Sequence, residues 1–79
     1  MKTRDDIVEL LATSIGEDTA RSLVDGSVLR RGIDPQAITK QEALDVLEDI
    51  AAEPGLAGVT ARFAKSKVHL RWTVDDERG

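Results

Sequence analysis

The sequence of 79 residues contains no cysteine and no tyrosine, and it has a single phenylalanine, tryptophan and histidine. Without cysteine the chain cannot form a disulfide framework, a thiolate zinc site or a cysteine nucleophile. It has no apolar run of about 18 residues, so we expect no transmembrane helix. The start, from Met1 to Asp6, lacks the apolar stretch of a signal peptide. These absences predict a soluble, cytoplasmic protein that does not bind membranes.

Groups suited to catalysis are also scarce. A serine–histidine–aspartate arrangement would have to use His69, and no glycine-rich nucleophile elbow is present, so we expect His69 to be an exposed polar residue. Adjacent carboxylates such as those of Asp5 and Asp6 diverge by roughly 100° around a helix and do not share a cleft. Phosphate-binding and calcium-loop motifs are missing. We therefore expect a protein that is not an enzyme and uses no cofactor and no metal ion.

The composition is nevertheless that of a folded chain. Apolar residues make up 41% and charged residues 33%, which is too apolar for intrinsic disorder. At this length we expect one small domain, residues 1–74, followed by a polar C-terminal tail at 75–79. The predicted fold class is all-α: a compact bundle of three to four short helices with an extended C-terminal segment.

Apolar residues spaced three and four apart predict three helices, at about 4–15, 17–31 and 40–52. The third has the strongest local signal, because Thr39 and Glu42 have the spacing of a complete capping box. Capping residues or acidic side chains also stand at the starts of the first two helices, where the helix dipole favours negative charge.

Some finer features of the first 58 residues also lead to expectations. Arg21 and Asp25 are four residues apart on the second helix, so we expect them to pair. Gly26 lies inside that helix at a cost of about 1 kcal/mol relative to alanine, which a close helix crossing would explain. Gly55 and Gly58 follow a proline and indicate a plain turn.

The segment 56–74 fits two secondary structures. Read as a helix, it places four apolar residues on one face, interrupted near Ser66 and Lys67. Read as a strand, it alternates well from Val68 onwards. We favour a helix at about 57–67 followed by an extended segment to residue 74. The alternative is an α+β fold in which residues 59–74 form a β-hairpin on the three helices. The four apolar residues are Leu56, Val59, Phe63 and Leu70.

Charge is distributed unevenly. Residues 1–55 carry six basic and twelve acidic side chains, a net −6, whereas residues 56–74 carry four basic side chains and no acid; the tail adds −2. The acidic residues of the third helix include a stripe that a basic neighbour would complement. The basic residues are Arg62, Lys65, Lys67 and Arg71, and the acidic stripe is Glu42, Asp45 and Asp49.

The two aromatic residues have different expected roles. Phe63 is at helical spacing from Val59, so we expect it in the core. Trp72 is either a lid on the core or an anchor at an interface, because tryptophan is enriched at binding hot spots. Core burial is the favoured reading, since a domain this small needs every large side chain.

We therefore expect a small non-enzymatic adaptor module that binds another protein, or itself as a homodimer, through the segment 56–74. Exposed members of an apolar set would anchor the partner and the basic residues would steer it. The alternative is a nucleic-acid-binding regulator with a helix-turn-helix-like element that uses the same basic residues. The predicted partner-binding residues are Arg62, Lys65, Lys67, Arg71 and Trp72; the apolar set is Leu56, Val68, Leu70 and Trp72.

Overall fold

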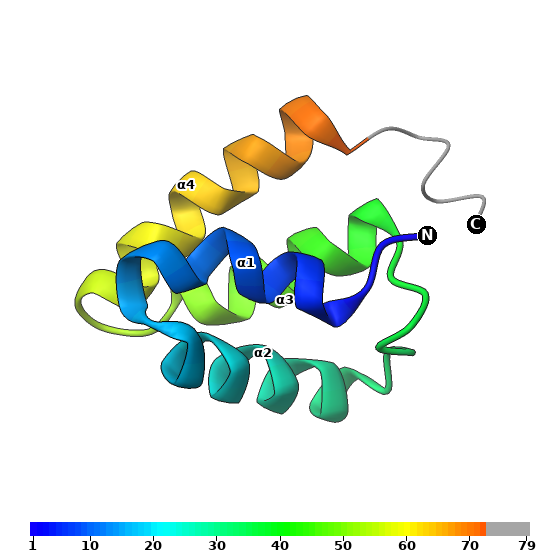
Figure 1. Ribbon diagram of the computed structural model, residues 1–79, viewed down its shortest axis with the longest axis horizontal. Coiled ribbons are helices and arrows are strands. Elements are labelled where there is room, and N and C mark those ends of the chain that lie inside the picture. Colours follow the sequence, from blue (N-terminus) through cyan, green and yellow to red (C-terminus); the bar gives the residue numbers. More distant parts are fainter. Residues whose placement is uncertain (73–79) are drawn as a thin grey trace.

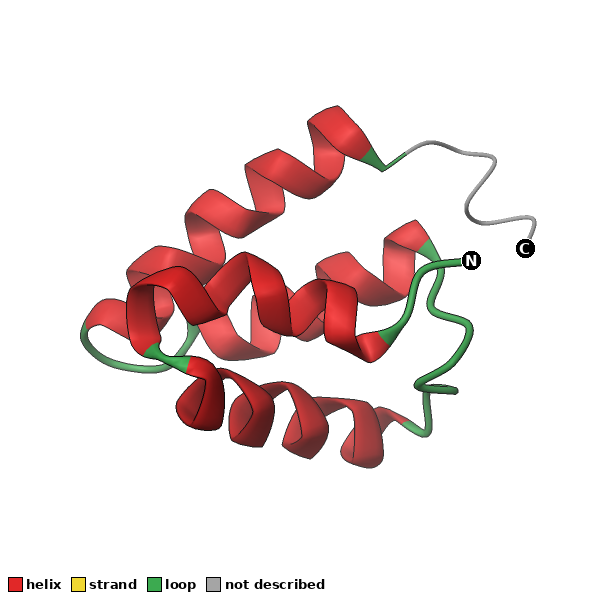
Figure 2. Cartoon of the chain, viewed as in Figure 1, coloured by secondary structure: helices red, strands yellow, loops and turns green. Residues whose placement is uncertain are grey.

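The computed structural model describes residues 1–72, which form a bundle of four α-helices (Figure 1). The predicted all-α class is confirmed. Within residues 1–72 every segment is a helix or a connecting loop and there is no β-strand (Figure 2). The helices are α1 (Arg4–Ile15), α2 (Glu17–Arg31), α3 (Lys40–Ala51) and α4 (Leu56–Arg71).

Local sequence signals set the boundaries of the first three helices. The first two span the predicted residues, and the third ends at Ala51, one residue before the predicted end. The predicted capping box of α3 is confirmed. The Thr39 hydroxyl accepts a hydrogen bond from the Glu42 N–H at 3.0 Å, and the Thr39 N–H donates to the Glu42 carboxylate at 3.0 Å. Two backbone donors that have no partner inside the helix are thus satisfied.

The end of α2 requires a glycine. Gly32 adopts a left-handed conformation with φ of 67°. Its N–H donates to the Leu29 carbonyl, and the N–H of Ile33 donates back to the Val28 carbonyl at 3.1 Å. This pair of bonds is the Schellman motif, and it turns the chain toward α3.

The C-terminal prediction is wrong over the residues that the structure describes. Helix α4 runs on from Leu56 to Arg71, so residues 68–71 are helical rather than extended and there is no hairpin from 59 to 72. Among residues 68–72 only Trp72 has an extended backbone. The rest of the expected extended segment, and the tail at 75–79, lie outside the described residues. Residues 68–71 are helical despite their strand-like alternation, because the residues before them already form a helix. Each further residue extends that helix with one more hydrogen bond.

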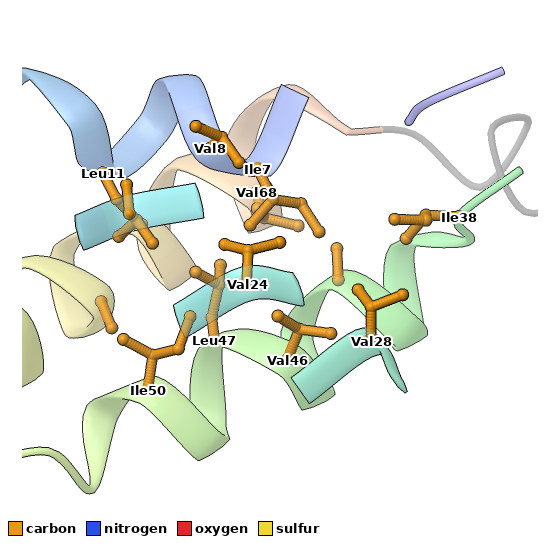
Figure 3. Close-up of a cluster of buried hydrophobic side chains, with 14 of the residues drawn as sticks. Ile7, Val8, Leu11, Val24, Val28, Ile38, Val46, Leu47, Ile50 and Val68 are labelled. Atoms are coloured by element: carbon orange, nitrogen blue, oxygen red, sulfur yellow. The ribbon is translucent and has the colours of Figure 1, made fainter. Parts of the chain in front are cut away.

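The helices surround one apolar core. Helix α1 packs against α2 and α4, and α3 packs against the same two helices, so each helix has two neighbours. Side chains from all four helices meet between them (Figure 3). The largest fully buried ones include Ile7 and Leu11 of α1, Val24 of α2, Leu47 of α3 and Val68 of α4.

The close approach between helices occurs at Gly58 and not at Gly26. A Cβ atom on Gly58 would lie 2.2 Å from the carbonyl oxygen of Glu53 and 3.0 Å from that of Ala51. A Cβ atom on Gly26 would meet only the side chain of Arg30, at 3.8 Å. Gly58 is thus part of α4, where it lets the helix begin directly against the end of α3, and the predicted plain turn at this residue is wrong.

Ion pairs connect consecutive helices. The Arg4 guanidinium binds both carboxylate oxygens of Asp25 at 2.7 and 3.0 Å, which joins α1 to α2. The predicted pair of Arg21 with Asp25 is wrong, because Asp25 is occupied by Arg4 and Arg21 pairs with Glu17 instead. The same type of contact joins α2 to α3 and α3 to α4, through Arg31 with Asp49 and Lys65 with Glu48.

Candidate interaction surface

The outer face of α4 carries an unusual line of large apolar side chains. Phe63 is 68% exposed, so its predicted place in the core is wrong. Leu56 and Leu70, at either end of the helix, are 58% and 86% exposed, and Val59 is 46% exposed. We call these four residues the apolar seam. They share one face of the helix, and at least 46% of the surface of each residue is exposed.

The opposite face of α4 explains why the seam points outward. The residues that α4 buries against α1 and α3 are small: Gly58, Thr60, Ala61, Ala64 and one larger residue, Val68. Small side chains let helix backbones approach closely, and the contact at Gly58 requires this. Helix α4 therefore buries its small residues and exposes its large ones, the reverse of an ordinary amphipathic helix.

Basic side chains lie beside the apolar seam. Arg62, Lys67 and Arg71 are all exposed, and none of them makes an ion pair with another residue of 1–72. Lys65 differs, because its ammonium group pairs with Glu48 of α3 and so helps to hold α4 on the bundle. Three of the four predicted basic residues thus present charge at the surface, while the fourth has an intramolecular partner.

Trp72 lies at the end of α4 and is only 5% exposed. Its backbone N–H donates to the Val68 carbonyl at 2.9 Å, and the Lys2 ammonium lies 5.5 Å from the centre of its ring. This position matches the core lid rather than an exposed anchor. Of the apolar set predicted to contact a partner, Val68 and Trp72 are buried, and only Leu56 and Leu70 are exposed.

The acidic stripe of α3 is complemented mainly by α2, not by the basic segment. Asp49 accepts hydrogen bonds from the Arg31 guanidinium, with two contacts of 2.7 Å, and from the buried Ser27 hydroxyl at 2.6 Å. The hydrogen bonds from Arg31, and then from Ser27, lower the pKa of Asp49 to about 2. Asp45 is hydrogen-bonded by Gln41 on its own helix, and Glu42 caps α3.

Other surface features offer less for recognition. An open groove of about 630 Å³ lies between the start of α1, the end of α2 and the loop after it, and two of its charged side chains, Arg4 and Asp25, already bind each other. Within residues 1–72 no three histidine or acidic side chains are grouped as metal ligands would be, and His69 is exposed. None of the described helices is long and apolar enough to span a bilayer.

Comparison with known proteins adds no relative. No protein-family model, curated protein sequence or solved structure matches the chain.

The sequence showed the candidate surface only in part. The apolar seam was visible as a helical face, but its break near Ser66 and the strand-like pattern after it made a helix through to Leu70 the less favoured reading. One feature of the sequence could have predicted that Phe63 is exposed. The other side of the helix is rich in glycine and alanine, which is the composition of a close-packed face.

Proposed function

We propose that this chain is a small non-enzymatic interaction module that binds a partner through the exposed face of α4. The observation that carries the proposal is the apolar seam, in which four large apolar side chains on one helix face are exposed. Scattered surface leucines are ordinary, but a contiguous apolar patch with a polar rim is typical of an interaction site.

The basic residues beside the seam support the same proposal. Arg62, Lys67 and Arg71 have no acidic partner in residues 1–72, although the chain as a whole is acidic. Charges at the rim of an interface mainly raise the rate of association and select the partner, while apolar side chains at its centre supply most of the affinity. Phe63, at the middle of the seam, replaces Trp72 as the proposed anchor.

Nucleic-acid binding is the second candidate, because α3, a tight turn and the basic α4 follow one another as in a helix-turn-helix. Affinity for nucleic acid depends on many phosphate contacts, and α4 offers them three cations that have no acidic partner within residues 1–72. A recognition helix also presents polar groups to base edges, whereas the most exposed line of α4 is apolar. Both features favour a protein partner.

The test compares matched surface variants. A partner is first recovered with the chain after nuclease treatment. Its affinity is then measured for the wild type, Leu70→Ala and Leu29→Ala. Leu70 and Leu29 are a matched pair, because they are 86% and 83% exposed but lie on different helices. We expect Leu70→Ala and Phe63→Ala each to weaken binding by about 1–2 kcal/mol and Leu29→Ala to leave it unchanged. Loss of recovery after nuclease treatment, with an affinity that falls as roughly the third power of salt concentration, would instead support nucleic acid.

A further inference from the structure

The spacing of the residues along the outer face of α4 carries an inference about the partner, and it rests on the function proposed above. Leu56, Val59, Phe63, Ser66 and Leu70 are separated by three, four, three and four residues. This is the a and d spacing of a heptad repeat, in which every a or d residue faces a second helix. All five are exposed. An a/d seam is narrower than the apolar face of a helix that packs in a globular core or lies on a membrane.

The length of the seam sets the size of the partner segment. From Leu56 to Leu70 the helix rises by about 21 Å, because each residue adds about 1.5 Å. A second helix of about two heptads would therefore cover the seam. Ser66 at a d position would be the one polar residue within that contact, where it contributes less apolar surface than the leucine that is usual at d.

The flanking charges decide which helix fits. In this register Arg62 takes a g position and Lys67 takes an e position, the two positions whose side chains face the flanks of the partner helix. If α4 paired with a second copy of itself in parallel, Arg62 of one helix would face Lys67 of the other. If the two helices were antiparallel, g positions would face g positions and e positions would face e positions, so arginine would face arginine and lysine would face lysine. Either arrangement places cation against cation, so pairing with itself is disfavoured.

We infer that the apolar seam of α4 binds a two-heptad helix of a different protein that carries aspartate or glutamate at its e and g positions. The apolar side chains of the two helices interlock, and carboxylates of the partner pair with Arg62 and Lys67. The contact is small, which suits a reversible interaction.

The experiment titrates the full 79-residue chain with two designed helical peptides and follows peptide fluorescence anisotropy. Both peptides have leucine at a and d over about three heptads; one has glutamate at every e and g position and the other has lysine. Like charges keep each peptide from pairing with itself. We expect the glutamate peptide to bind at least about tenfold more tightly than the lysine peptide, and the difference to shrink at high salt.

Two variants make the result specific to the seam. Phe63→Ala should reduce binding of the glutamate peptide about tenfold or more with little change in melting temperature, because the side chain is exposed. Arg62→Glu combined with Lys67→Glu should reverse the preference, so that the lysine peptide binds more tightly. Leu29→Ala, on α2, is the matched control and should leave both affinities unchanged.

Several outcomes would overturn the inference. Equal binding of both peptides, or no binding of either, would contradict an acidic partner helix. Sedimentation that shows a dimer lost in Phe63→Ala would assign the seam to a second copy of the chain. Binding to vesicles with anionic lipids, without binding to the glutamate peptide, would assign it to a membrane surface. If the chain forms such a dimer, the proposed function stands and only the inferred partner is wrong. Vesicle binding would contradict both the inferred partner and the proposed function.

Discussion

Two glycines inside helices give opposite expectations for the same substitution. In α2, Gly26→Ala would place a methyl group 3.8 Å from the nearest heavy atom, a terminal nitrogen of Arg30, which is ordinary contact. Alanine then stabilises the helix by about 0.5–1 kcal/mol because it restricts the unfolded chain. In α4, Gly58→Ala would place the same group 2.2 Å from the carbonyl oxygen of Glu53.

The magnitude at Gly58 follows from what must move. The obstructing atoms belong to the backbone of the α3–α4 connection, so the clash is not relieved by rotating a side chain. Overpacking of this kind costs about 2–3 kcal/mol, and the helix preference of alanine returns about 1 kcal/mol. We expect Gly58→Ala to destabilise the protein by about 1–2 kcal/mol.

The assay is thermal and urea unfolding of both variants followed by circular dichroism. For a domain of this size 1 kcal/mol corresponds to about 4–8 °C, so Gly26→Ala should melt above the wild type and Gly58→Ala clearly below it. If Gly58→Ala melted at or above the wild-type temperature, α4 would not begin against the end of α3, and the outward direction of the apolar seam would lose its basis.

Three further predictions follow from the contacts of single residues. Thr39→Ala should lower stability by about 0.5–2 kcal/mol in thermal melts, because Glu42 loses its capping partner; an unchanged melting temperature would mean that α3 is not capped there. Asp49 stabilises the folded protein by about 1–2 kcal/mol after solvent screening. This stabilisation is complete above about pH 4 and is lost as pH falls through the lowered pKa of Asp49, about 2. Acid titration should therefore destabilise the wild type more than Asp49→Asn. Trp72→Ala should cost about 3 kcal/mol or more in urea unfolding, whereas Phe63→Ala should change stability by less than about 0.5 kcal/mol; equal effects would contradict the burial described here.

The first three helices were predictable because their signals are local. A capping box joins residues three apart, and the Schellman turn at Gly32 involves only the last turn of α2 and the two residues after that helix. Such contacts form within one turn of backbone, so the sequence indicates them without reference to the rest of the chain.

The partners of charged residues were less predictable, since they depend on distant segments. Arg21 and Asp25 have the spacing of a helix pair, yet Asp25 binds Arg4, which is 21 residues away in the sequence. Asp49 was seen as part of an acidic stripe for a basic neighbour, but its partner Arg31 comes from α2. The spacing of residues along one helix says nothing about which second helix lies beside it.

The sequence by itself determined the position of three helices and the presence of a basic, acid-free C-terminal segment, because propensity, capping and charge are properties of nearby residues. It favoured the all-α class, but the α+β alternative was excluded over residues 59–72 only by the helix α4. Only the tertiary structure decided which face of α4 is buried. Both faces carry apolar residues, and the face with glycine and alanine is the buried one because it allows α4 to begin close against the end of α3. The larger residues, with Phe63 at their centre, are therefore left exposed at the surface.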